Sequence, residues 1–378
     1  MNERTTMVLG QPSWRLASSH VEAFVTQLGG HVAPVTFDRG GGRFAPMAVA
    51  PWAEEPLDAG QTACTRVLRG DFFCMPFGGN ANMFDGERHP PHGETANRSW
   101  SFEGLESRER RTTLHLRLDT DVRPGRVDKR ISVVDGENAV YSRHTISGMS
   151  GPMTVGHHAM LKFPGTSGSG LISTSPFLLG QVYPEPVERP EDGDSCLQPG
   201  ATFTSLAAVP TVSGNVADLS RYPARRGYED VAMVVSDPAH AFAWSAVAFP
   251  DEGYAWFALK NPRVLHQTLF WFSNGGRRYA PWNGRHVDTL GVEEVTSYFF
   301  QGLAESVRPN PISSAGHPTA LSLDADKPLE VRYIMAVAEI PREFGPIAEI
   351  IAAPNGVMLH SHDGHEVHAR LDPSFLDA

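Results

Sequence analysis

The sequence predicts an all-β protein, organised as a large antiparallel β-sandwich with few short helices. Short segments in which apolar and polar residues alternate recur along the chain, and this is the period of a half-buried strand. The 36 glycines and 30 prolines of the chain favour turns over helices. Many short strands joined by turn residues are typical of a sandwich or a barrel.

The expected strands are short and closely spaced. In one of them Leu114, Leu116 and Leu118 alternate with polar residues, which indicates one face in a core and one in solvent. Asp135-Gly136 and Asp363-Gly364 are typical hairpin turns. The segments that we expect to form strands are 21–25, 32–37, 114–118, 127–133, 139–146, 153–163 and 265–272, and we expect 357–371 to form a hairpin around Asp363-Gly364.

One segment has the pattern of a helix instead. Between Pro341 and Ala352, the apolar residues Phe344, Ile347 and Ile350 recur every three residues. This spacing places side chains on one face of a helix, so we expect a helix there.

Length alone permits more than one domain in 378 residues. The segment Tyr183–Gly200, rich in proline and acidic residues, has the composition of a linker. Strand-like segments continue after it without a change of character, so we interpret it as an insertion. We therefore expect residues 1–378 to form a single domain.

The charge and the cysteines restrict the partners and the location. The formal net charge is −11, whereas a protein that binds nucleic acid needs a basic surface. No apolar run reaches the roughly 18 residues of a membrane span, and the first residues lack the apolar core of a signal peptide. Three cysteines, without metal-binding spacing, are typical of free thiols. We expect a cytoplasmic protein with no nucleic-acid or membrane partner.

The segment Asn283–Phe300 contains two adjacent carboxylates, Glu293 and Glu294, followed by β-branched and aromatic residues. That composition favours a strand, and successive strand residues point to opposite faces. One glutamate can therefore face a pocket as a general base while the other faces away. Two solvated surface acids have the same pattern, and the local sequence leaves both interpretations open.

Three separated pieces of the chain resemble the galactose mutarotase (aldose 1-epimerase) superfamily. His92-Gly93 is similar to the His-Gly of that family, with Arg69 as the matching arginine on an earlier strand. The piece GHHAMLKFP, 156–164, resembles the strand of the family's second histidine, best matched by His158. Gly291-Val292-Glu293 is similar to the segment of the late catalytic glutamate. The family's sugar-binding aspartate has no match that the sequence identifies.

The resemblance implies a supersandwich fold and the interconversion of sugar anomers, with no metal or cofactor. Glu293 would be the base that takes the anomeric proton, and His158 would be the acid that protonates the ring oxygen. The partner would be a small carbohydrate. The residues expected to contact it are His92, Arg69, Trp282, Asn80, His157 and Arg285.

Structural roles compete with several of these assignments. His158 could bond a backbone carbonyl, Arg69 could form a salt bridge with Asp71, and Trp271 could belong to the core. Glu294 replaces Glu293 as the base if the register is shifted by one residue. If Arg277, Arg278 and Arg285 line the cleft, the substrate is an anionic sugar.

Two other functions remain open. A carbohydrate-binding protein of the same fold would bind sugar without accelerating the exchange of anomers. A metal-dependent enzyme would use His89 and His92 with His157 or His158 as ligands, although Pro90 and Pro91 break the regular strand that would align them.

Overall fold

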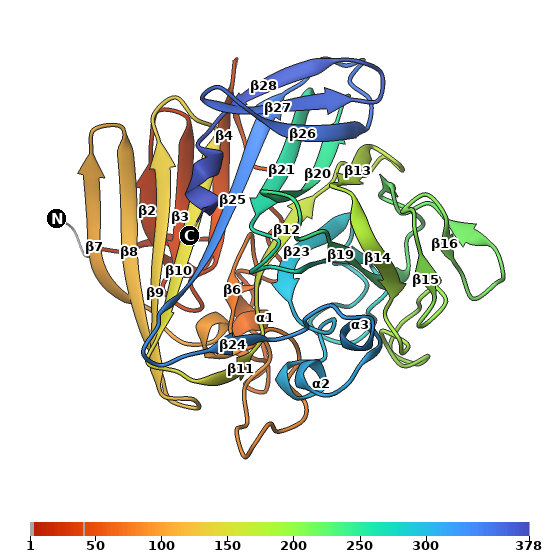
Figure 1. Ribbon diagram of the computed structural model, residues 1–378, viewed down its shortest axis with the longest axis horizontal. Helices are drawn as coiled ribbons and strands as arrows, with labels where there is room; N and C mark the ends of the chain where they lie inside the picture. The colour runs from red at the N-terminus through yellow and green to blue at the C-terminus, as the bar shows by residue number, and fades with distance from the viewer. Residues whose placement is uncertain (1–3, 41, 378) are drawn as a thin grey trace.

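Two large antiparallel sheets packed face to face dominate the computed structural model, which describes residues 4–40 and 42–377. All pairings between strands of these sheets are antiparallel. The prediction of an all-β sandwich is confirmed, and Figure 1 shows the strands grouped into layers with only short helices.

The first large sheet has nine strands, which lie in the order β18-β13-β20-β21-β25-β10-β9-β8-β7. Leu114, Leu116 and Leu118 of β8 are buried while their neighbours are more exposed, as the alternation predicts. In chain order the strands are β7 (Ser101–Arg108), β8 (Arg111–Thr120), β9 (Gly125–Val134), β10 (Ala139–Ser147), β13 (Gly170–Thr174), β18 (Arg221–Tyr222), β20 (Ala243–Phe249), β21 (Tyr254–Lys260) and β25 (Leu329–Glu339).

The second large sheet has seven strands, which lie in the order β15-β14-β19-β22-β23-β12-β6. Every residue of β22 and β23 is buried, because one face of this sheet packs in the sandwich and the other is covered by loops. In chain order the strands are β6 (Phe73–Cys74), β12 (Val155–Lys162), β14 (Phe177–Val182), β15 (Thr202–Phe203), β19 (Tyr228–Ser236), β22 (Gln267–Asn274) and β23 (Thr289–Thr296).

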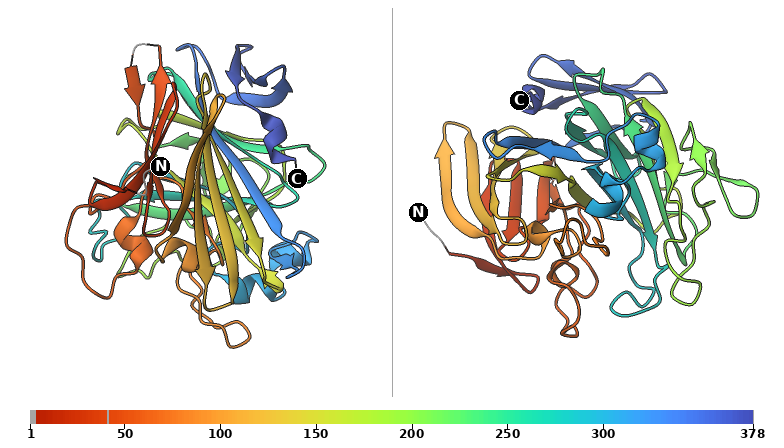
Figure 2. Two further views of the ribbon diagram at one scale, coloured as in Figure 1. Left: turned by 90° about the vertical axis from the view of Figure 1, so that its left-hand side faces the viewer. Right: turned by 60° about the horizontal axis from the view of Figure 1, so that its bottom comes forward.

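A five-stranded N-terminal sheet packs against strands β8 and β9 of the nine-stranded sheet and shares a core with it. Trp14, Val25 and Phe37 belong to the same apolar cluster as Leu114 and Ile131 of the nine-stranded sheet. Figure 2 shows these strands, in red, next to the orange strands β7–β9. The strands are β1 (Thr6–Val8), β2 (Gln11–Ala17), β3 (Val21–Thr26), β4 (Val32–Arg39) and β5 (Gly42–Phe44).

A C-terminal sheet of β26 (Ile347–Ala353), β27 (Gly356–Ser361) and β28 (Glu366–Arg370) covers the outer face of the nine-stranded sheet. The helix predicted for 341–352 is therefore wrong. Ile347 and Ile350 are both buried, but a bulge between Ile347 and Glu349 shifts the register of the strand. This extra residue turns the alternation of a strand into the three-residue spacing of a helix.

The remaining elements are short. The hairpin predicted at Asp363-Gly364 is present: His360 pairs with Glu366 across it, and residues 362–365 form the turn. The other strands are β11 (Gly151–Met153), β16 (Val209–Pro210), β17 (Val216–Ala217) and β24 (Leu321–Leu323). The helices are α1 (Ala63–Val67), η1 (Glu94–Ala96), α2 (Leu303–Val307), α3 (Pro311–Ser314) and η2 (Pro373–Leu376).

The segment Tyr183–Gly200 leaves and re-enters the same sheet. It follows β14, and β14 pairs directly with β19, which comes later in the chain. The strands on both sides of the excursion therefore belong to one sheet, as an insertion requires.

Candidate active site

A cavity of about 320 Å³ lies on the outer face of the seven-stranded sheet. That volume is at the lower end of the range for small-molecule sites. Its floor is formed by β12, β19, β22 and β23, and its walls by α1 and by the loops around Gly79, Pro91 and Trp282. The lining side chains include Thr62, Cys64, His92, His158, Trp271, Arg277, Tyr279, Trp282, Glu293 and Phe300.

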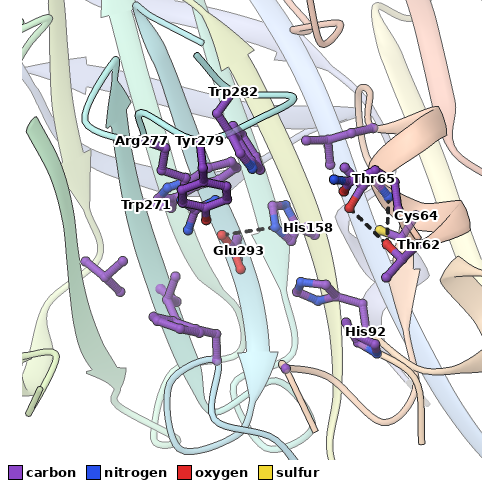
Figure 3. Close-up of a pocket in the computed structure, with 17 residues that line it drawn as sticks. Thr62, Cys64, Thr65, His92, His158, Trp271, Arg277, Tyr279, Trp282 and Glu293 are labelled. Atoms are coloured by element: carbon purple, nitrogen blue, oxygen red, sulfur yellow. Dashed lines mark hydrogen bonds and ion pairs between the residues drawn. The ribbon is translucent and has the colours of Figure 1, made fainter. Parts of the chain in front are cut away.

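His158 and Glu293 are direct cross-strand neighbours on β12 and β23. Residues directly opposite each other on antiparallel strands point to the same face, and Nε2 of His158 lies 3.4 Å from Oε1 of Glu293. Figure 3 shows the two side chains side by side in the cavity. The backbone N–H of His158 donates to the backbone carbonyl of Phe72, 2.9 Å away, and the imidazole stacks on the Phe72 ring.

Burial favours the neutral form of both members of this pair. Both side chains are more than nine-tenths buried. Burial raises the pKa of Glu293 well above its ordinary value, against the opposing charge of Arg277. Burial also lowers the pKa of His158 well below its ordinary value, and positive charge on neighbouring histidines lowers it further. Between the lowered pKa of His158 and the raised pKa of Glu293, the pair therefore holds one proton between its two members.

Glu294 faces the opposite side of β23, as strand alternation predicts. Its carboxylate lies 2.5 Å from Nζ of Lys260 and accepts a hydrogen bond from Thr268, 2.7 Å away. Both partners are inside the sandwich, so Glu294 has no access to the cavity. The register that places Glu293 at the cavity is the predicted one.

Close packing beside Glu293 requires Gly291. A Cβ on this residue would lie 2.8 Å from Oε1 of Glu293 and 3.0 Å from Cβ of Trp271. Gly291 pairs with Trp271 across β22 and β23. The missing side chain thus leaves room for the carboxyl group under the indole.

His92 and Trp282, two of the predicted contact residues, line the cavity. The His92 ring meets His158 edge to face at 5.2 Å, and burial lowers the pKa of His92 to about 4. His92 has a φ of 59° and is followed by Gly93 with a φ of 74°, so this turn is held in the left-handed region. Trp282 packs edge to face on Trp52 at 4.7 Å.

The other four predicted contact residues lie elsewhere, and the structure does not place them at the cavity. Arg69 is fully buried and donates to the backbone carbonyls of Val8, Leu9 and Val67, so neither its predicted role nor a salt bridge with Asp71 is realised. Asn80 cross-links its own loop by donating to the carbonyls of Pro76, Gly78 and Pro90.

His157 and Arg285 are also engaged outside the cavity. His157 occupies the opposite face of β12, where Nδ1 lies 2.9 Å from Asp71 and the ring stacks on Tyr333. Arg285 forms a two-pronged ion pair with Glu55 at 2.6 and 2.7 Å on the surface.

Arg277 is the arginine that reaches the cavity. Its Nε lies 2.5 Å from Glu188 and 3.8 Å from Glu229. Its guanidinium carbon lies 5.2 Å from the centre of the Trp271 ring and 4.5 Å from that of Trp282. Arg278 pairs instead with Asp194 on the surface.

Glu229 lies beneath this arginine and was not predicted from the sequence. It accepts a hydrogen bond from Nε1 of Trp271, 2.8 Å away. Burial raises the pKa of Glu229 to about 7, while the charge of Arg277 opposes the rise. Glu229 and Asp230 are adjacent in β19, as Glu293 and Glu294 are in β23. Two adjacent acidic residues within a strand-like segment are the sequence pattern that could have identified Glu229.

The four histidines of the alternative metal-site interpretation, His89, His92, His157 and His158, do not converge on one point. His89 lies 2.8 Å from Glu87, and His157 and His158 point to opposite faces of β12. Within residues 4–40 and 42–377, no three His, Cys, Asp or Glu side chains converge as metal ligands. All the helices described are short, and none has the length and hydropathy of a membrane span.

Comparisons with known proteins identify the fold. No family model matches the sequence, and no curated protein matches it significantly. Solved structures do match. A galactose mutarotase-like protein from Clostridium acetobutylicum superposes with a TM-score of 0.60 and 10% identity over 89% of this chain and 98% of that one.

Two further structures agree with this match. A candidate aldose 1-epimerase from Klebsiella pneumoniae has a TM-score of 0.60 and 12% identity, covering 88% of this chain and 81% of that one. A candidate aldose 1-epimerase from Escherichia coli K12 has a TM-score of 0.56 and 14% identity over 88% and 100% of the two chains. The protein thus has the galactose mutarotase-like fold, as the sequence motifs predicted.

Proposed function

We propose that this protein is an aldose 1-epimerase that interconverts the anomers of a neutral monosaccharide by opening and closing the sugar ring. The observation that carries the proposal is the buried pair of Glu293 and His158, 3.4 Å apart on the floor of a sugar-sized cavity. The motifs that predicted these two residues belong to the family whose fold the chain has.

The chemistry needs one proton acceptor and one proton donor. Glu293 takes the proton from the anomeric hydroxyl, the bond between the anomeric carbon and the ring oxygen breaks, and His158 gives its proton to that oxygen. The open-chain aldehyde rotates about its bond to the next carbon, and the same steps run backwards on the other face. A proton passed from Glu293 to His158 prepares the reactive form, and the total number of protons on the pair does not change.

The charges around the cavity favour a neutral sugar over an anionic one. Arg277 already has two carboxylates beside it, at 2.5 Å for Glu188 and 3.8 Å for Glu229. Arg278 and Arg285, the other two arginines considered for an anion, are paired on the surface. The described residues of the cavity wall therefore offer an anionic substrate no net positive charge, while the terminal N–H groups of Arg277 stay free to donate to a sugar oxygen.

The aromatic walls suit a sugar ring. Trp271, Tyr279 and Trp282 lie around the pair (Figure 3), and such rings offer an apolar face beside polar groups. His92, whose ring centre lies 5.2 Å from that of His158, would bind a hydroxyl.

The three cysteines are free, and we propose a cytoplasmic location on that basis.

Mutarotation followed by polarimetry or NMR tests the proposal on pairs of neutral and acidic sugars of the same configuration, such as hexoses and the matching uronic acids. We expect the protein to accelerate anomer exchange of at least one neutral aldose, and to act less on its acid. Sugar binding without acceleration would instead support a non-catalytic carbohydrate-binding protein.

A further inference from the structure

The arginine at the cavity comes from a different part of the chain than the sequence motifs predict. Arg69, the match to the family's arginine, has its guanidinium bound to three backbone carbonyls at 2.9 to 3.1 Å. Arg277, in the loop after β22, lines the cavity instead. The two residues are far apart in sequence, so a motif search cannot detect the exchange.

Arg277 has free hydrogen-bond donors. Its Nε is occupied by Glu188 at 2.5 Å, while neither terminal nitrogen has a hydrogen-bond partner within the described ranges 4–40 and 42–377. The side chain keeps an exposed fraction of 18% although most of it is enclosed by Trp271 and Trp282. The terminal N–H groups are therefore open to a molecule in the cavity.

Arg277 and the carboxyl group of Glu293 both lie close to the Trp271 side chain. The Trp271 ring lies 5.2 Å from the guanidinium carbon, and Trp271 is the cross-strand neighbour of Gly291, over which Oε1 of Glu293 packs. Figure 3 shows Arg277, Trp271 and Tyr279 on one side of Glu293 and His158 on the other. The charge of Arg277 lowers the pKa of Glu293 and of His92, so its field extends over the site.

We propose that Arg277 is a further catalytic residue, whose terminal N–H groups bind the sugar oxygen that gains negative charge as the ring opens. This inference rests on the proposed function. When Glu293 removes the anomeric proton, the electron pair forms the carbonyl bond and the ring oxygen leaves with the other pair until His158 protonates it. A fixed cation beside that oxygen stabilises the transition state more than the ground state.

Glu188 and Glu229 hold the guanidinium of Arg277 in place and leave its terminal N–H donors unoccupied. Glu188 holds Nε and Glu229 lies on the same edge, so the fork of terminal nitrogens stays free. The planar guanidinium over two indole rings has little freedom to reorient. A lysine has no Nε to anchor and one nitrogen to share, so we expect Arg277→Lys to be a poor substitute.

Kinetics of Arg277→Gln and Arg277→Lys test the inference, with Arg278→Gln as the matched control. Arg278 is the next residue, but it pairs with Asp194 outside the cavity. We expect kcat of Arg277→Gln to fall about 100-fold or more, as on removal of other donors to a developing oxyanion, with a smaller change in KM. Arg278→Gln should retain normal kcat. Circular dichroism and thermal unfolding show whether each variant is folded.

Two further readouts separate catalysis from a structural role. The alkaline limb of the pH profile should move to higher pH in Arg277→Gln, because the charge that lowers the pKa of Glu293 is gone. Guanidinium chloride at millimolar concentration should restore part of the activity of Arg277→Ala, whereas sodium chloride at equal ionic strength should not.

The possible failures are distinct. A wild-type protein that accelerates the anomer exchange of no sugar overturns the proposed function, and with it this inference. An active wild-type protein overturns only the role of Arg277 if Arg277→Gln keeps its kcat, or if its loss appears in KM alone with an unmoved pH profile and no rescue by guanidinium.

Discussion

Glu293 and Glu294 are adjacent residues whose environments differ completely. Glu293 lies at the cavity with His158 at 3.4 Å, and Glu294 lies in the sandwich with Lys260 at 2.5 Å. The sequence predicted that the two point to opposite faces, because a strand alternates. It could not predict Lys260 as the partner of Glu294, because that contact joins strands that are distant in sequence.

These environments predict opposite effects of the two Glu→Gln substitutions. Glu293→Gln should lower the mutarotation rate by two or more orders of magnitude, about 3 kcal/mol in the barrier, without loss of stability, because it removes a desolvated acid. Glu294→Gln should leave the chemistry intact but cost about 3–5 kcal/mol of unfolding free energy, because it leaves Lys260 buried without a counter-charge.

Mutarotation assays and denaturant unfolding on both variants measure the two effects separately. An inactive but stable Glu294→Gln together with an active Glu293→Gln would show that the base is the other glutamate. Full activity in both variants would rule out the acid–base pair.

The titration of the pair predicts a broad pH optimum. At low pH both members hold a proton, and His158 must lose its proton first because burial lowers its pKa. At high pH Glu293, whose pKa burial raises, loses the remaining proton. Activity should therefore fall on the acid side as His158 becomes protonated, and on the alkaline side as Glu293 ionises.

The pH dependence of kcat/KM, after subtraction of the spontaneous rate, measures both limbs. The residual activity of Glu293→Gln should keep the acid limb and lack the alkaline one, because glutamine does not titrate. An alkaline limb that survives in this variant would assign it to another group.

At the scale of elements, local patterns succeeded where each strand has one covered face, as in β8. They failed where an irregularity or a distant contact decides the structure. The bulge in β26 gave Ile347 and Ile350 a helical spacing. Arg69 matched a motif, yet its side chain is bound by carbonyls of the N-terminal hairpin, which no local pattern reveals.

The strand pair β22–β23 carries a prediction of its own. Gly291→Ala should reduce activity strongly, because the new methyl group would lie 2.8 Å from Oε1 of Glu293 and 3.0 Å from Cβ of Trp271, closer than atoms pack. The carboxyl group or the indole must move, and a displacement of about 1 Å at a catalytic group costs about 100-fold in rate.

Comparison of Gly291→Ala with Gly284→Ala separates this effect from general damage, because Gly284 lies in a loop. Its φ of 68° makes alanine strained there, so Gly284→Ala should lose stability rather than catalytic rate. A Gly291→Ala variant with normal kcat would show that the packing around Glu293 adapts.

At the scale of the whole molecule, the sheets share apolar cores. This holds for the N-terminal sheet, the two large sheets and the C-terminal sheet. Residues of the N-terminal sheet and of β8, β9, β22 and β23 contribute to the same apolar cluster. The C-terminal sheet packs on the outer face of the nine-stranded sheet. A core continuous over sequence-distant strands predicts that the chain unfolds as one unit.

Limited proteolysis tests this prediction at the segment 183–200. Residues 185–186 and 189–191 of this proline-rich segment are exposed, and such sites are where proteases cut folded proteins. Because β14 before it pairs with β19 after it, we expect a nicked protein whose fragments stay associated and unfold in a single transition. Two fragments that separate without denaturant and each keep a folded circular dichroism spectrum would show two domains.

Glu188 lies in this segment and holds Arg277, so the nicked protein should also lose activity while it remains folded.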